Sequence, residues 1–177
     1  MQLSSLVHLI GAASSLTQSD RVIVLGSAAL LATHATLGEA GAPLELTRDA
    51  DLWLEPCDEE LAAMLHEALG EGSLFDQHFG YHLDVLRPSI ADTFAEGWAL
   101  RTQAVAGTNA RALSAVDVAA VKLRVGRPKD EALVAQLFAS RLVEPDDVAE
   151  LLRKMHWSEA EMHQTILRWG RLALTVR

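Results

Sequence analysis

Cysteine and long apolar runs are both scarce in this chain of 177 residues. Because its one cysteine, Cys57, has no second thiol to pair with, an internal disulfide is excluded and a reducing compartment is favoured. The longest apolar stretches, such as residues 22–25 and 28–32, fall far short of the roughly 20 residues that a membrane-spanning helix needs. Residues 1–16 carry no positive charge ahead of their apolar part, which disfavours a secretion signal. We therefore expect a globular, cytoplasmic protein with no membrane partner.

Positive charge is also in short supply, with 15 Lys and Arg residues against 24 Asp and Glu residues and a formal net charge of −9. Since affinity for a phosphate backbone grows with clustered Lys and Arg, this balance argues against a general nucleic-acid-binding surface. It leaves room for a local basic groove, because many of the basic side chains fall in residues 122–129 and 153–177. A P-loop is excluded, since no Gly-x-x-x-x-Gly-Lys-Ser/Thr sequence occurs.

Hydrophobic periodicity and turn residues predict strands alternating with helices, followed by helices alone. In the first part we expect helix 3–16, strand 21–25, helix 28–36, loop 37–47, strand 48–54, a helix capped by Asp58 and ended by Gly70 and Gly72, strand 81–86 and strand 98–106. In the second part we expect helices 114–124, 128–140, 145–154 and 158–174, the first capped by Ser114. The predicted fold class is α+β, with a small mixed sheet packed by helices in residues 1–106 and a C-terminal helical segment, 107–177, packed on that core.

Two acids on one predicted strand are the clearest sign of chemistry. Asp49 and Asp51 are two residues apart, so their side chains share a face of the strand. Two like charges held that close cost free energy unless a cation lies between them. Upstream, Gly26-Ser27 forms a turn suited to phosphate, and Asp84 adds a third acid on the strand 81–86. The combination predicts a divalent metal site for nucleotidyl transfer.

Each of these features also has a purely structural interpretation. Gly-Ser is common at strand-to-helix turns, and Asp49 with Asp51 is compatible with a solvated strand edge. The charged block 122–130 is equally compatible with an ordinary helix carrying spaced ion pairs. For His82 we expect the face of the strand opposite to Asp84, and no part in a site. The acids and the Gly-Ser turn together favour a functional site over these alternatives.

Three segments resemble the nucleotidyltransferase superfamily. Leu25-Gly26-Ser27 and Asp49-Ala50-Asp51-Leu52 match in order its pattern of an apolar residue, Gly, Gly or Ser, a spacer, and two acids each followed by an apolar residue. The strand 81–86 looks like the one that carries the third carboxylate of the superfamily. Residues 113–130 resemble a segment of small bacterial nucleotidyltransferases in the AbiEii-like and related groups. The resemblance therefore implies a nucleotidyltransferase core, of the polymerase-β type, within the predicted α+β fold.

The resemblance also implies a set of metal ligands. Asp49 and Asp51 would bridge two Mg²⁺ ions, and Asp84 would complete the metal on the nucleophile side and help to deprotonate the acceptor. These three acids are the predicted catalytic residues.

The nucleotide-binding residues implied by the resemblance lie in two places. Gly26 would let the backbone approach the β- and γ-phosphates, and the Ser27 hydroxyl would help to hold their charge. Lys122 or Arg127 would neutralise the triphosphate. For Asp130 two roles stay open, since it would either position Lys122 or orient the acceptor.

The implied reaction moves an NMP from a nucleoside triphosphate to a hydroxyl of RNA, of a protein or of a small molecule. Within the superfamily the acceptor is read by appended elements, so the motif leaves it open. A toxin–antitoxin setting is implied by the same resemblance, with a cognate toxin or antitoxin protein as partner. The alternative is a non-catalytic binding module of the same fold, an antitoxin or regulatory partner, which the acidic character of the chain slightly favours.

Overall fold

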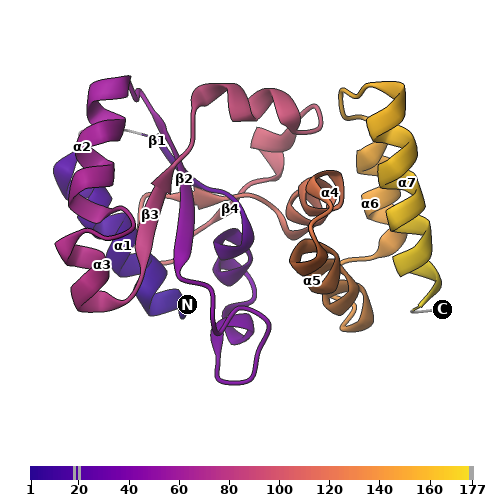
Figure 1. Ribbon diagram of the computed structural model, residues 1–177, viewed down its shortest axis with the longest axis horizontal. Coiled ribbons are helices and arrows are strands. Elements are labelled where there is room, and N and C mark those ends of the chain that lie inside the picture. The colour runs from indigo at the N-terminus through magenta and orange to yellow at the C-terminus, as the bar shows by residue number, and fades with distance from the viewer. Residues whose placement is uncertain (18, 20, 176–177) are drawn as a thin grey trace. The chain divides into compact units, whose positions relative to one another are not determined.

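The computed structural model describes residues 1–17, 19 and 21–175 (Figure 1). The chain divides into two compact units, the first made of Met1–Pro88 and Thr102–Leu113 and the second of Ser89–Arg101 and Ser114–Arg177. The chain therefore enters the second unit at Ser89, returns to the first unit at Thr102, and enters the second unit again at Ser114. The boundary expected after residue 106 falls inside the returning segment of the first unit.

The first unit is built on one mixed sheet with the strand order β3-β2-β1-β5-β4. The strands are β1 (Arg21–Val24), β2 (Asp49–Glu55), β3 (His82–Val85), β4 (Gln103–Ala104) and β5 (Arg111–Ala112). β1 runs antiparallel to β2 and parallel to β5, β2 runs parallel to β3, and β4 runs antiparallel to β5. The expectation of helices with a small mixed sheet is confirmed.

Apolar side chains hold this sheet to its helices. Within β2, Ala50, Leu52 and Leu54 are buried and alternate with the two acids, as the two-residue period of a strand requires. Figure 1 shows α1 (Leu3–Leu16), α2 (Glu59–Leu69) and α3 (Leu74–Phe79) together on one side of the sheet. The buried face of α1 presents Leu6, Leu9, Ile10 and Ala13, and α2 buries Leu65 and Leu69. The core of the first unit therefore lies between the sheet and these helices.

Two expected elements differ from the structure. In place of a helix over 28–36 the chain forms two short 3₁₀ helices, η1 (Ser27–Ala32) and η2 (Ala35–Gly38). All four residues of 28–31 are buried, so packing on every side fixes the tighter turns and overrides α-helix propensity. In place of a strand over 98–106 the chain forms η4 (Trp98–Arg101), followed by the two-residue strand β4. Arg101 holds this turn by donating to the carbonyl oxygens of Ala95 and Glu96.

The described part of the second unit is helical, and its first segment contains the 3₁₀ helices η3 (Pro88–Thr93) and η4. Its α-helices are α4 (Ala115–Val125), α5 (Pro128–Ala139), α6 (Pro145–Leu152) and α7 (Glu159–Leu174), within two residues of the predicted bounds. Ser114 caps α4 as expected, since its hydroxyl accepts from the N–H of Asp117. Among the described residues, no helix combines the length and the apolar character needed to cross a membrane.

Candidate metal centre

Three carboxylates meet on the sheet of the first unit. β2 and β3 lie side by side, and their register places Asp51 opposite Asp84. Asp49, Asp51 and Asp84 each offer an oxygen, and these oxygens all lie within 4.8 Å of one another. All three side chains remain partly exposed to solvent. The structure therefore brings together the acids that the sequence pattern predicted as ligands.

The Gly-Ser turn lies against this cluster. Gly26 lies two residues after β1 and has φ +57° and ψ −156°, a conformation that is essentially restricted to glycine. A Cβ atom at this position would meet Oδ2 of Asp51 at 1.9 Å. The backbone N–H of Leu25 donates to the carbonyl oxygen of Asp51 at 2.8 Å, which fixes the turn relative to β2. Ser27, half-buried, follows as the first residue of η1.

The donor set fits a hard divalent cation. Mg²⁺ and Ca²⁺ take oxygen ligands, and a six-coordinate shell of radius about 2.1–2.4 Å spaces its ligand atoms about 3–5 Å apart. The separations among Asp49, Asp51 and Asp84 are of that size. Their mutual repulsion, roughly 1–4 kcal/mol for each pair at about 4 Å near a protein surface, would be relieved by such an ion. The three residues could therefore hold a metal ion, without selecting between these two cations.

The other predicted nucleotide-binding residues form a cluster of their own in the second unit. Lys122 Nζ lies 3.0 Å from Asp130 Oδ1, and Arg127 donates to both oxygens of Asp130 at 2.6 and 3.2 Å. Asp130 is only 1 % exposed. Its burial alone would raise its pKa, but the hydrogen bonds from Arg127 and Lys122 outweigh that effect and hold the pKa below its usual value. Asp130 therefore binds Lys122, and the roles of all three toward a nucleotide stay predictions.

The orientation expected for His82 was wrong. Because it is two residues from Asp84 on the same strand, it lies on the same face as that acid. Its register partner on β2 is Asp49, and its Nδ1 lies 3.2 Å from Oδ1 of Asp76. Asp76 also accepts from Arg48, the residue that precedes Asp49. The period of a strand was enough to place His82, whereas no sequence motif marks Asp76 as its partner.

Comparisons with protein-family models, with curated proteins and with solved structures found no significant match to this chain in any of the three. A function for this chain therefore rests on the geometry of the site and on the sequence pattern that predicted it.

Proposed function

We propose that this chain is a Mg²⁺-dependent nucleotidyltransferase that transfers an NMP from a nucleoside triphosphate to a hydroxyl group. The observation that carries the proposal is the meeting of Asp49, Asp51 and Asp84 within 4.8 Å of one another, next to a Gly-Ser turn. The arrangement of the sheet adds support. The turn follows β1, the paired acids lie on antiparallel β2, and the third acid lies on β3, parallel to β2, in the order that the nucleotidyltransferase pattern requires.

In the proposed reaction the oxygen of the acceptor hydroxyl forms a bond to the α-phosphorus, and the bond from that phosphorus to pyrophosphate breaks. Asp49 and Asp51 would hold the metal ion that the sequence pattern implies, together with Asp84. When bound, the ion supplies positive charge that stabilises the charge developing on the phosphoryl oxygens. Asp84 accepts the proton of the acceptor hydroxyl.

The Gly-Ser turn supplies the remaining part of the proposed site. Because Gly26 has no side chain, the carboxylate of Asp51 lies directly against the backbone of this turn. The hydroxyl of Ser27 is placed at the same turn and would donate to a phosphate oxygen. Through the contact between Gly26 and Asp51, binding of a phosphate at the turn and of a metal ion at the acids would be coupled.

The test is transfer of label from each α-³²P-labelled nucleoside triphosphate in Mg²⁺, with RNA, protein and small-molecule fractions of a cell extract as acceptors. We expect label in one fraction with the wild-type chain, and loss of transfer by at least about 100-fold in D49N and D51N, because each removes a charged ligand. D146N, a change of an acid on α6 in the second unit, is the matched control. Wild-type transfer rates in the D49N/D51N double variant would refute the assignment.

An absence of transfer with every nucleotide and every fraction would favour the alternative, a binding module of the same fold. In that case a metal site at the three acids would serve structure or regulation. The fraction that takes up label would also identify the class of acceptor.

A further inference from the structure

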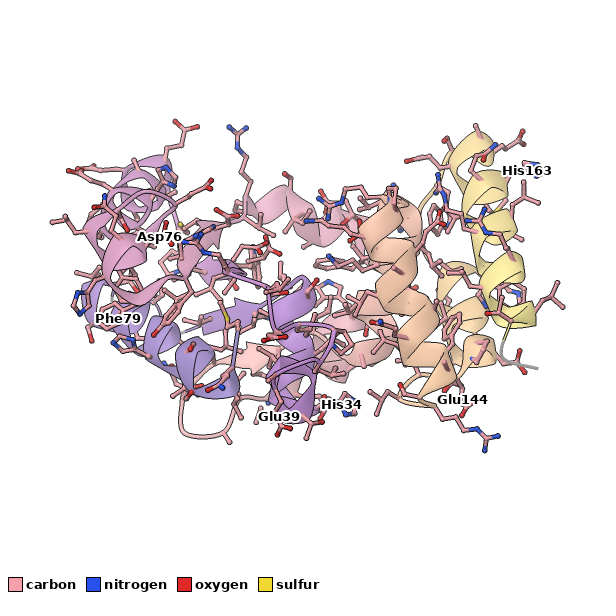
Figure 2. All side chains as sticks on the ribbon, turned by 60° about the horizontal axis from the view of Figure 1, so that its bottom comes forward. His34, Glu39, Asp76, Phe79, Glu144 and His163 are labelled. Atoms are coloured by element: carbon pink, nitrogen blue, oxygen red, sulfur yellow. The ribbon has the colours of Figure 1, made fainter. Side chains whose placement is uncertain are left out.

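The proposed reaction does not use Asp76, a buried acid whose side-chain partners neighbour the candidate metal ligands. It lies on α3, is 7 % exposed, and is labelled in Figure 2 together with Phe79 of the same helix. Its Oδ2 accepts from the backbone N–H of Gly72 at 3.1 Å, and its Oδ1 accepts from Arg48 at 2.9 Å and lies 3.2 Å from Nδ1 of His82. One carboxylate therefore joins α3 to residues at the start of both β2 and β3.

The two side-chain partners of Asp76 lie next to the metal-binding acids. Arg48 directly precedes Asp49, and its carbonyl oxygen accepts from the backbone N–H of His82 at 2.9 Å. Arg48 also donates through Nε to the carbonyl oxygen of Gly80 at 2.9 Å, so it holds the chain on both sides of Tyr81. His82 is the register partner of Asp49. The network therefore fixes the register of β2 and β3 at the residues that carry the first candidate metal ligands.

The charge on Asp76 is part of this arrangement. The hydrogen bond from the backbone of Gly72, the hydrogen bond from His82 and the positive charge of Arg48 hold the pKa of Asp76 below its usual value, in spite of its burial. An ionised acceptor forms shorter and stronger hydrogen bonds to Arg and to a protonated or N–H-donating His than a neutral amide does. An amide at this position would keep the shape of the side chain and lose that attraction.

We propose that Asp76 is a positioning residue, which sets the separation of Asp49 and Asp84 through Arg48 and His82. The proposal rests on the proposed function, because it assigns the network to the same metal centre. Residues that do not bind the metal but orient its ligands commonly contribute about 10–100-fold to metal affinity, which is lost when they are replaced. A purely structural acid would change the stability of the fold and leave the affinity of the folded chain for metal unchanged.

The experiment compares the affinity for Mn²⁺ of wild-type chain, D76N and D117N by calorimetry, at a temperature where circular dichroism shows all three folded. Asp117 is the matched control, because it is 1 % exposed and paired with an arginine, Arg101, at 2.6 Å, within the second unit. We expect a dissociation constant for Mn²⁺ about 10-fold or more higher in D76N, and a wild-type value in D117N. The electron paramagnetic resonance spectrum of Mn²⁺ bound to D76N should also differ from that of Mn²⁺ bound to the wild-type chain.

Each other outcome has a definite meaning. Equal Mn²⁺ affinity in wild-type chain and D76N overturns the positioning role and leaves the proposed function standing. A wild-type chain that does not bind Mn²⁺ overturns the proposed function and the positioning role together. Should D76N not fold, R48Q replaces it. The Arg48 side chain is 59 % exposed, so a glutamine in its place buries no unpaired charge at position 48. An unchanged affinity in R48Q then overturns the proposal, and a 10-fold loss supports it.

Discussion

At the scale of single residues, Gly26 connects the predicted motif most directly to the geometry of the site. Its backbone conformation excludes other residue types, and its missing side chain leaves room for the carboxylate of Asp51. The sequence pattern predicted a close approach to phosphate at this glycine. The structure adds that the same glycine lies against Asp51, one of the acids predicted to bind metal. No local pattern contains this relation between residues far apart in the chain.

Gly26→Ala should therefore damage the site by two separate effects. The backbone strain of the substitution costs about 1–3 kcal/mol, and the new methyl group would displace the Asp51 carboxylate. Thermal unfolding and Mn²⁺ calorimetry measure the two effects. Gly107→Ala is the control, because Gly107 has φ +80° and no atom within 4 Å of an added Cβ, so strain alone applies there. Equal metal affinity in the two variants would contradict the contact.

The ion pair of Lys122 with Asp130 gives a second prediction for single residues. Both side chains are buried, and removing one member of such a pair leaves the other without full compensation. Lys122→Met keeps the apolar stem and should lower the free energy of unfolding by about 2–4 kcal/mol in urea titration. Arg127→Ala should cost under about 1 kcal/mol, since the Arg127 side chain is 52 % exposed. Equal stability of Lys122→Met and wild-type chain would show that the pair contributes nothing.

At the scale of elements, capping residues were the reliable signals. Asp58 and Ser114, the two predicted caps, each accept from a backbone N–H in the first turn of α2 and α4. Ser158 caps α7 in the same way, a role that the sequence analysis did not assign to it. The sequence analysis missed α3, although Ser73 caps it in the same way by accepting from the backbone N–H of Asp76. It also predicted a strand where the turn η4 forms. Arg101 bonds to Asp117 and to two nearby carbonyl oxygens, and these contacts impose a 3₁₀ turn where the sequence favours a strand.

The cap of α7 predicts a pH dependence of stability. The backbone N–H and the hydroxyl of Ser158 both donate to Glu161 and, with Arg124, lower the pKa of that carboxyl from 4.5 to about 2. Because the pKa of Glu161 is lower in the folded chain than in the unfolded chain, its ionised form stabilises the folded chain above pH 4.5. This contribution to stability is lost as pH falls from 4.5 to 2. Glu161→Gln should therefore have a lower melting temperature than wild-type chain at pH 6, with the difference vanishing near pH 2. A difference that is constant over this range would contradict the cap.

At the scale of the whole molecule, the division into two units lies beyond the reach of local patterns. The pairing of β1 with β5 joins Ile23 to Arg111, and β5 has only two residues, too few for a visible alternation. The returning segment Thr102–Leu113 therefore could not be assigned to the first unit from sequence. The positions of Asp49, Asp51 and Asp84 on strands could be predicted, because each strand has a strong apolar pattern. The structure shows that the two strands are neighbours in the sheet.

The metal and nucleotide sites are tested together by a crystal structure of the chain with Mn²⁺ and a non-hydrolysable nucleoside triphosphate, in which anomalous scattering locates the Mn²⁺. We expect a Mn²⁺ peak within bonding distance of carboxylate oxygens of Asp49, Asp51 and Asp84, with the triphosphate against Gly26 and Ser27. An ordered nucleotide elsewhere on the chain, or saturating Mn²⁺ with no peak at the three acids, would contradict this expectation.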